Sequence, residues 1–298
     1  MRLLLLGANG QLGQCFKQVS AGFPEFEIQA YGRELDITQP GLVAEVLHDS
    51  YYDVVINCAA YNQVDLAEVE PNKADAVNHL AVRHLAELVK QQGGFLVHFS
   101  TDYVFDGLKN RPYLETDQPF PLNVYGQTKL AGENAMLAVN PPGLVVRTSW
   151  LFSPFSSNFL TRMRQLGATR SSIQVVSDQI GSPTCALDLA QAVFDIVSFR
   201  QKTLDENPNH QAWWSTQVCH FANKGQASWA ELATEIMRLS ELDCKVLPIS
   251  TADYGVKACR PAYSVLDATQ IQAWLPGPIR SWREALGGHD LFLTSPVR

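Results

Sequence analysis

Short apolar runs alternate with longer amphipathic segments through the first half of the chain. Unbroken apolar runs indicate strands that are buried on both faces, as in a parallel sheet. We predict strands at residues 3–6, 26–31, 53–57, 95–100 and 144–148. We predict helices between them at residues 11–20, 41–48, 73–92 and 125–139. The apolar side of the third helix is expected to carry Ala76, Leu80, His84, Ala86 and Val89.

The pattern becomes less regular after Trp150. A run rich in Ser and Phe predicts a loop over residues 152–158, and apolar spacing predicts a helix over 186–198. The polar, proline-containing stretch 200–211 predicts an exposed loop. Ser228 and Glu231 have the spacing of a capping box, which predicts that a helix begins there and reaches about residue 240.

This order of elements predicts the architecture. Parallel strands joined by helices form right-handed βαβ units. The fold class is therefore α/β, a Rossmann-type doubly wound parallel sheet with a smaller C-terminal lobe. We place the sheet domain at residues 1–150 and the lobe at 151–298, parts of which are expected to pack back onto the sheet domain.

Composition and charge narrow the class of protein. The chain has 298 residues, of which 46% are hydrophobic and 18% charged, as in ordinary globular proteins. The net charge is −7 without any basic run, which argues against nucleic acid or an anionic membrane as a partner. No stretch approaches the roughly 18 apolar residues of a membrane span. The six cysteines are scattered without a Cys-x-x-Cys pair, so we expect a cytoplasmic protein with reduced thiols.

A glycine motif follows the first predicted strand. It reads Gly7-Ala-Asn-Gly10-Gln11-Leu12-Gly13 and opens the first helix. Glycines here allow a tight turn and let backbone N–H groups approach a pyrophosphate at the helix N-terminus. An ordinary glycine-rich turn is the alternative, but the position favours dinucleotide binding by Gly7, Gly10, Gln11, Leu12 and Gly13.

The end of the second strand should contact the adenosine ribose. Arg33 comes first there, and a basic side chain suits the 2′-phosphate of NADPH. Glu34 leaves NADH as an alternative cofactor. We place Asp36 and Ile37 beside the adenine, and the other interpretation of Arg33 is a solvated turn residue.

Small residues end the third strand. We expect Ala60, Tyr61 and Asn62 to contact the cofactor, because small side chains before them let it lie close to the backbone. Core packing against a helix explains the small residues almost as well.

Tyr125 and Lys129 supply candidate chemistry. Their i, i+4 spacing puts a phenol and an ammonium on one helix face, where the cation would lower the pKa of Tyr125. Thr101 follows a predicted strand and could hydrogen-bond a substrate carbonyl. The alternatives are a solvated helix face for the pair and a polar turn for Thr101.

These motifs together resemble a known family. The chain resembles the extended short-chain dehydrogenases/reductases, and among them the dTDP-4-dehydrorhamnose reductases. The matching segments span almost the whole chain, at residues 7–13, 35–38, 57–61, 64–68, 100–107, 121–133, 147–152, 178–184, 220–225 and 260–261. The runs Ser-Thr-Asp-Tyr-Val-Phe and Asp-Gln-x-Gly-x-Pro-Thr are its most specific parts.

The resemblance implies a reaction and roles for residues. The reaction is NADPH-dependent reduction of dTDP-4-dehydro-β-L-rhamnose to dTDP-L-rhamnose, for cell-surface polysaccharide. Tyr125 would donate the proton, Lys129 would bind the nicotinamide ribose and acidify Tyr125, and Thr101 would polarise the carbonyl. Asp102 would lie beside the substrate, and Trp150 would pack against the sugar unless it is only a core aromatic.

Arg260 is a further candidate for the substrate. A forked guanidinium suits the pyrophosphate of a nucleotide sugar, and the alternative is a surface arginine in a turn before proline. The chain departs from the family at Asn62, where threonine is common, and in segment 200–214. We expect that segment, with its adjacent Trp213 and Trp214, to alter the substrate lobe or an oligomer surface.

The resemblance also implies a homodimer, since some family members are dimers bridged by Mg²⁺. Its ligands cannot be placed here, because position 15 is Cys and Asp188 is the one acidic residue near the start of the helix at 186. We therefore expect no obligatory catalytic metal.

Two other functions stay open. An epimerase or 4,6-dehydratase of the extended family would keep and regenerate NAD, although a dehydratase needs a second acid beside Thr101-Asp102. A non-catalytic chain similar to the regulatory subunit of methionine adenosyltransferase is the second alternative.

Overall fold

A six-stranded, fully parallel sheet forms the centre of the computed structural model, which describes residues 1–207, 210, 213–255 and 257–288. The strand order is β10-β5-β4-β3-β1-β2. The strands are β1 (Arg2–Leu6), β2 (Glu27–Tyr31), β3 (Val54–Asn57), β4 (Phe95–Thr101), β5 (Gly143–Thr148) and β10 (Thr216–His220). Order and direction confirm the predicted doubly wound α/β class.

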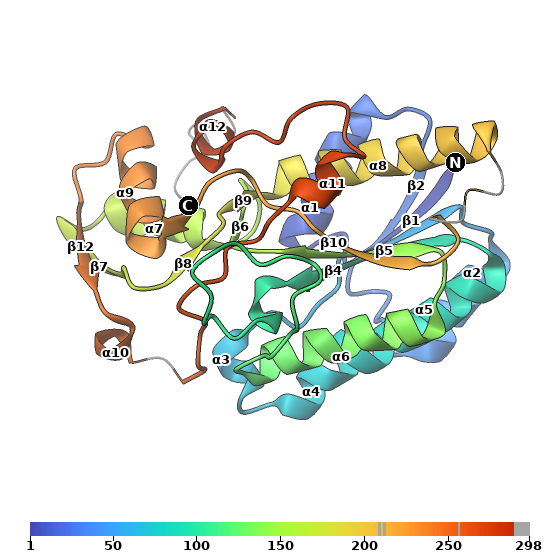
Figure 1. Cartoon of the computed structure of the whole chain (residues 1–298), viewed down its shortest axis with the longest axis horizontal. Coiled ribbons are helices and arrows are strands. Elements are labelled where there is room, and N and C mark those ends of the chain that lie inside the picture. The colour runs from blue at the N-terminus through green and yellow to red at the C-terminus, as the bar shows by residue number, and fades with distance from the viewer. Residues whose placement is uncertain (208–209, 211–212, 256, 289–298) are drawn as a thin grey trace.

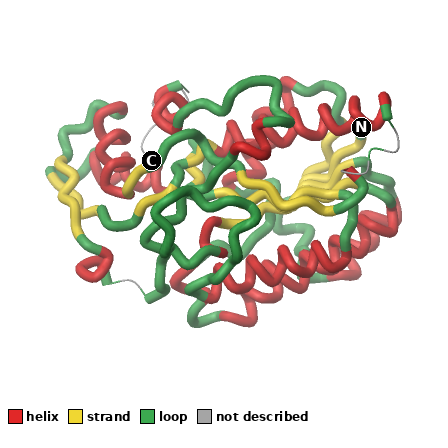
Figure 2. Tube along the Cα trace, in the orientation of Figure 1, coloured by secondary structure: helices red, strands yellow, loops and turns green. Residues whose placement is uncertain are grey.

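Helices cover both faces of this sheet (Figure 1). Figure 2 shows the strands in yellow between two layers of helix. One layer holds α1 (Gln11–Val19) and α8 (Ala186–Glu206), with the short α11 (Thr269–Gln272) near β10. The other holds α2 (Pro40–Asp49), α3 (Val64–Ala67), α4 (Pro71–Asp75), α5 (Ala81–Gln92) and α6 (Val124–Val139).

Burial explains the apolar runs. All residues of β3, β4 and β5 are buried, because helices cover the sheet on both sides. Outer β2 is largely exposed or half-buried, and its sequence Glu-Ile-Gln-Ala-Tyr is accordingly mixed. Burying each aliphatic side chain of the central strands contributes roughly 1.5–3 kcal/mol, so these strands hold the sheet together.

The C-terminal lobe lies against the carboxyl ends of the strands (Figure 1). We use this name for α7 (Phe159–Gly167), β7 (Ser172–Val176), β8 (Ile180–Gly181), β11 (Ala227–Ser228), α9 (Trp229–Leu239), β12 (Lys245–Ile249), α10 (Thr251–Tyr254) and α12 (Trp282–Gly287). The predicted capping box is confirmed at α9, where Ser228 and Glu231 bond each other's backbone N–H groups. The short strands β6 (Leu151–Phe152) and β9 (Thr184–Cys185) pair between the lobe and the sheet.

The second half of the chain returns to the sheet. β10 pairs in parallel with β5, and α8 packs against α1. Buried residues of α8 share one core cluster with Leu3, Leu5 and Phe16. The division near residue 150 is thus a division of the sequence, and the sheet domain itself is completed by later residues.

The predicted exposed loop at 200–211 is wrong for its first part. Helix α8 continues to Glu206, and Arg200 is only 8% exposed with its guanidinium 4.4 Å from the ring centre of Phe95. The polar side chains of this stretch are the solvent side of an amphipathic helix. Residues 208–209 and 211–212 lie outside the described residues.

The predicted helix at 73–92 contains a π turn. α4 passes into a π-helical segment, η2 (Ala76–Leu80), before α5 begins. A π turn holds more residues than an α turn and so changes which side chains share a face. The expected apolar side is wrong at Leu80, which ends this turn and is 52% exposed, and at His84, which is partly exposed. Ala86 and Val89 are buried as expected, together with Val82.

Among the residues that the structure describes, no helix combines the length and the apolar character needed to cross a membrane.

Candidate active site

A cavity of about 1000 Å³ runs along the carboxyl edge of the sheet. It extends from the turn after β1, past the ends of β3 and β4, to the residues that follow β5. Of the residues proposed from sequence, these line it: Gly7, Gly10, Gln11, Leu12, Arg33, Asp36, Ile37, Ala60, Asn62, Thr101, Asp102, Tyr125, Lys129 and Trp150. Sites of nucleotide-binding α/β sheets lie at this edge.

The glycine turn is shaped by close backbone approaches. Gly7 has φ +73°, and a Cβ there would lie 2.6 Å from the backbone nitrogen of Ala59. Gly10 caps α1 and leaves the N-terminus of this helix facing the cavity. Gly13 does not line the cavity, because it packs against the carbonyl of Gly7, where a Cβ would overlap. The turn can thus hold a phosphate against backbone N–H groups.

The segment after β2 presents an exposed cation to the same cavity. Arg33 is exposed and lines the cavity, while Glu34 accepts a hydrogen bond from the N–H of Gly32. That backbone bond holds the pKa of the Glu34 carboxyl below its usual range. Asp36 accepts hydrogen bonds from the N–H and hydroxyl of Thr38, which shapes the turn beside buried Ile37.

Tyr61 does not enter the cavity. Its hydroxyl donates to Glu70 at 2.9 Å, and its N–H donates to Oδ1 of Asn78 at 2.9 Å. The side chain therefore points toward α4, whereas Ala60 and Asn62 on either side of it line the cavity.

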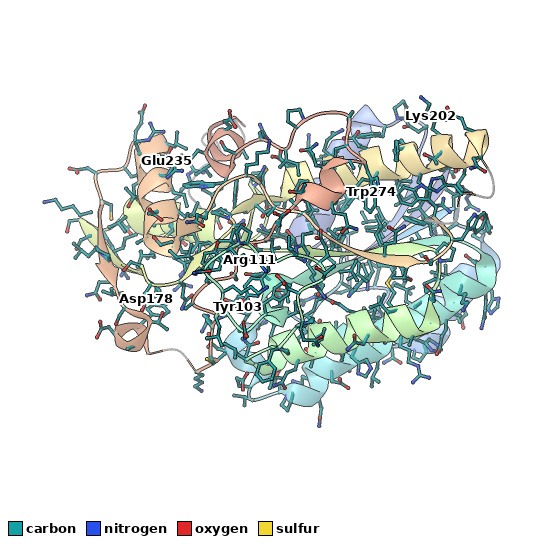
Figure 3. The ribbon with its side chains drawn as sticks, in the orientation of Figure 1. Tyr103, Arg111, Asp178, Lys202, Glu235 and Trp274 are labelled. Carbon is teal, nitrogen blue, oxygen red and sulfur yellow. The ribbon has the colours of Figure 1, made fainter. Side chains whose placement is uncertain are left out.

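Tyr125 lies in the first turn of α6, which Asn123 caps by accepting from the N–H of Gly126. Its ring meets the ring of Tyr103 edge-on, with 5.8 Å between centres. Figure 3 places Tyr103 between the sheet domain and the C-terminal lobe. Burial raises the pKa of Tyr125 to about 12, although a hydrogen bond with Thr101 acts in the opposite direction. The expected acidification by Lys129 is thus not found, because burial is the largest effect on the pKa of this phenol.

Lys129 is one turn further along α6 and only 2% exposed. Its Nζ donates to the carbonyl oxygen of Phe99 at 2.5 Å and lies 3.4 Å from Nε2 of His98, so its contacts are with β4. Burial lowers the pKa of Lys129 to about 8, while the charge of Glu133 raises it. Desolvation is the larger of these two effects, and the carboxylate of Glu133 also forms a buried two-pronged ion pair with Arg147.

Thr101 and Asp102 end β4 beside Tyr125. The Thr101 hydroxyl accepts from the N–H of Tyr103 and donates to Oδ1 of Asp102, both at 3.1 Å. Asp102 is 2% exposed, and burial raises its pKa to about 7. The site therefore holds the hydroxyls of buried Thr101 and half-buried Tyr125 beside a buried carboxyl that is easily protonated.

Trp150 forms one wall between the sheet domain and the C-terminal lobe. Its backbone has φ +47°, and its ring stacks on Trp229 of α9 with 3.5 Å between ring centres. The ring also lies over Gly181, where a Cβ would be 2.5 Å from the indole. The contacts with Trp229 and Gly181 stabilise a tryptophan whose backbone lies in the left-handed region.

Arg260 does not line the cavity. Its guanidinium forms a two-pronged ion pair with Asp65 at 3.1 and 2.7 Å and donates to the carbonyl of Ala258. It also bonds Tyr103, the neighbour of Tyr125. Arg260 thereby ties a late segment to α3.

The segment around Trp213 is far from this site. Trp213 is 2% exposed and packs against Phe95 and Trp274, whereas Trp214 is 53% exposed. Phe95 begins β4, at the opposite end from Thr101. This places Trp213 in the core rather than in the expected substrate lobe.

Sequence reasoning missed other residues of the cavity. They are Asn9, Gly32, Leu35, Cys58, Ala59, Val77, Phe99, Ser100, Thr148, Ser149 and Leu151. Most directly follow or end a strand, so strand ends were the available signal. Val77 lies in the π turn, which nothing in the apolar pattern indicated.

No cluster of three or more His, Cys, Asp or Glu side chains suited to a metal occurs within the described part of the chain. Asp188 bonds Asn223 and Arg280 instead.

Comparison with known proteins shows which family this arrangement represents. A family model described as the RmlD substrate binding domain matches residues 1–289. A dTDP-4-dehydrorhamnose reductase of Aggregatibacter actinomycetemcomitans is 37% identical over 96% of this chain and 97% of its own length. The chain belongs to the dTDP-4-dehydrorhamnose reductase family. The resemblance seen in the sequence is thereby confirmed.

Solved structures of this family share the fold. The Bacillus anthracis reductase, solved in complex with NADP, has a TM-score of 0.86 at 35% identity and covers 96% of each chain. The Clostridium acetobutylicum ortholog has a TM-score of 0.87 at 36% identity, over 97% of this chain and 98% of its own. A UDP-glucose 4-epimerase from Brucella ovis, 17% identical with a TM-score of 0.78, shares the fold alone.

Proposed function

We propose that this protein reduces the 4-keto group of dTDP-4-dehydro-β-L-rhamnose to give dTDP-L-rhamnose, with NADPH as the hydride donor. The observation that carries the proposal is one continuous cavity with a glycine turn at one end and Thr101, Tyr125 and Lys129 at the other. Membership of the reductase family supports the choice of sugar nucleotide. The reaction would take place in the cytoplasm, and its product would be used to make cell-surface polysaccharide.

The cavity fits a dinucleotide. The glycine turn has room for a pyrophosphate because Gly7 and Gly13 carry no Cβ at their close backbone approaches. We infer that Arg33 pairs with the 2′-phosphate of NADPH, since it is the exposed cation at that end. Asp36 and Ile37 would flank the adenine, with Ala60 and Asn62 along the middle of the cofactor. NADPH, when bound, supplies the hydride.

The proton comes from Tyr125 in this proposal. As a hydride reaches the keto carbon, the carbonyl oxygen takes the phenolic proton, so the C=O bond becomes CH–OH and Tyr125 becomes a phenolate. Thr101 would donate a hydrogen bond to the same oxygen. The ammonium of Lys129, held on the same helix face, would stabilise the phenolate and bind the nicotinamide ribose.

Substrate binding is assigned to the polar and aromatic groups around this oxygen. Asp102 would face the sugar beside Thr101, and Trp150 would pack against its methyl face. Arg260 could meet the substrate pyrophosphate only after releasing part of its pairing with Asp65.

Tyr125→Phe tests the proposal, because it removes the proton donor and keeps the ring. We expect kcat/KM for NADPH oxidation with dTDP-4-dehydro-β-L-rhamnose to fall by about 10²–10⁴-fold, with the Kd for NADPH changed less than threefold. Wild-type turnover no higher than that of Tyr125→Phe would contradict the enzyme assignment and favour a regulatory subunit. Conversion of the sugar without NADPH consumption would favour an epimerase or dehydratase.

A further inference from the structure

A buried imidazole lies directly behind Lys129. His98 on β4 is 1% exposed, and it is a polar residue among mainly apolar ones in this buried strand. Its Nε2 lies 3.4 Å from Nζ of Lys129, and its Nδ1 lies 3.3 Å from Nδ2 of Asn57 on β3. A buried polar ring costs stability unless its nitrogens have partners, so these two contacts decide what His98 can do.

Asn57 decides which nitrogen of His98 carries the proton. Its Oδ1 accepts the N–H of Ala59 at 3.0 Å, which leaves the amide Nδ2 facing His98. That NH₂ group can only donate, so Nδ1 of His98 must accept. A neutral imidazole has one N–H, and it is therefore on Nε2, the nitrogen that faces Lys129.

Burial, with a further contribution from the charge of Lys129, lowers the pKa of His98 well below its usual range. The ring is accordingly neutral, and its Nε2–H points at Nζ. The ammonium form of Lys129 has no lone pair, so two hydrogen-bond donors would face each other. The neutral amine has a lone pair and can accept a hydrogen bond from Nε2–H. The carbonyl of Phe99 accepts from Nζ in either state.

We propose that His98, oriented by Asn57, is a positioning residue that disfavours the charged form of Lys129 and so sets the pH range over which Lys129 changes its charge. The inference rests on the role proposed above for Lys129. A lysine whose neutral and charged forms are close in free energy can release and regain a proton around neutral pH. Such a lysine can return a proton to Tyr125 after the phenol has given its own away.

Other charges around Lys129 do not remove this effect. Titratable or charged groups near Lys129 include His98 on β4, Asp102 after β4, Tyr125 and Glu133 on α6, Arg147 on β5 and Cys58 after β3. The segments η2 and α5, which also pack on α6, carry charges that have partly exposed partners: His79 pairs with Asp75, Arg83 and His84 pair with Glu87, and Lys90 donates to the carbonyl of Val139. Glu133 favours the ammonium, but its carboxylate is paired with Arg147. Burial keeps the thiol of Cys58 neutral by raising its pKa.

The first test needs no turnover. We would record ¹⁵N spectra of the cofactor-free protein with labelled histidine between pH 6 and 9, and assign His98 from the signal lost in His98→Gln. The expected result is a protonated Nε2 and an unprotonated Nδ1 throughout. A protonated Nδ1 would overturn the proposal, whether or not the protein is a reductase.

Asn57→Asp provides a matched reversal. The carboxylate keeps an oxygen for the N–H of Ala59 and accepts from Nδ1–H, so Nε2 becomes an acceptor for the ammonium of Lys129. We expect the ¹⁵N pattern of His98 to reverse. An unchanged pattern in the folded variant would contradict the role given to Asn57.

The functional readout is a pH profile. His98→Gln can turn an amide oxygen toward Nζ, and we expect the high-pH limb of kcat/KM to move upward by about one pH unit. The pH dependence of NADPH affinity should move the same way. His84→Gln is the control, because His84 is a partly exposed histidine on α5 outside the site. Equal profiles for wild type and His98→Gln, with circular dichroism showing both folded, would overturn the proposal.

Discussion

The hydroxyl of Thr101 forms hydrogen bonds with three neighbours but has only one proton to donate. It accepts from the N–H of Tyr103, and it bonds both Asp102 and the phenol of Tyr125. While Asp102 is ionised, the Thr101 proton is directed to the carboxylate. When Asp102 is protonated, it can donate to Thr101, which frees the threonine proton for a substrate carbonyl. The protonation state of Asp102 thus decides whether the Thr101 hydroxyl donates its hydrogen bond to the carboxyl or to the substrate.

Asp102→Asn should change the pH dependence of stability. The pKa of Asp102 is raised to about 7 in the folded protein, above its unfolded value, so the native state holds a proton that the unfolded state releases. The stability this supplies is present at low pH and is lost as pH rises through 7. We expect the free energy of unfolding of wild type, relative to Asp102→Asn, to fall by about 2 kcal/mol between pH 5 and 8.

Urea unfolding of both proteins at the two pH values measures this difference. The asparagine keeps an acceptor for Thr101, so lost hydrogen bonding does not confound the comparison. A difference that stays constant with pH would mean that Asp102 titrates normally.

Helix α6 is held in place at several points along its length. Gly126 packs against the carbonyl of Tyr103, and Gly132 packs against the carbonyl of Asn78 in the π turn η2. Asn78 itself donates to the hydroxyl of Thr128 at 3.1 Å. The ion pair of Glu133 with Arg147 ties the same helix to β5. These contacts fix where Tyr125 and Lys129 stand relative to the end of β4.

Gly132→Ala should destabilise the protein. A Cβ at this position overlaps the carbonyl oxygen of Asn78, so α6 and η2 must separate. We expect a loss of about 1–3 kcal/mol in the free energy of unfolding, measured by urea titration, together with a lower kcat. Asn134→Ala is the control, because Asn134 is exposed on the same helix.

The sign of the Gly132→Ala effect is diagnostic. Glycine to alanine in an unobstructed helix stabilises by roughly 0.5–1 kcal/mol. A stabilised Gly132→Ala protein would therefore disprove the close packing of α6 on η2.

At the scale of the whole molecule, late residues complete the sheet domain. β10 covers the edge of β5, and α8 covers the face of the sheet beside α1. Trp213 and Arg200 both pack on Phe95, the first residue of β4. At the other end of the strands, Arg260 pairs with Asp65 across 195 positions of sequence.

A fragment of residues 1–150 should fail to fold as a unit. Without α8 it leaves apolar residues of α1 and the sheet exposed, and without β10 it leaves β5 as an open edge. We expect near-ultraviolet circular dichroism to show no cooperative thermal transition, while the full chain shows one. A sharp transition in the fragment, with retained NADPH binding, would show that the sheet domain is independent.

Local pattern determined much of this protein. Apolar runs, glycines and capping residues act over a few positions, so the sequence alone predicted the strands of the first half, the turn at Gly7 and the capping box at Ser228. The i, i+4 spacing likewise predicted the shared face of Tyr125 and Lys129. The family motifs extended these predictions to the reaction.

Tertiary structure decided what depends on neighbours distant in sequence. The π turn at Ala76–Leu80 lies where α6 packs closely on it, and the partners of Tyr61, Arg260 and His98 come from other elements. Titration also depends on such neighbours, because burial shifts a pKa as strongly as a nearby charge. Spacing along the chain therefore predicted which groups share a helix face or a strand end, and only packing decided which partners hold their protons.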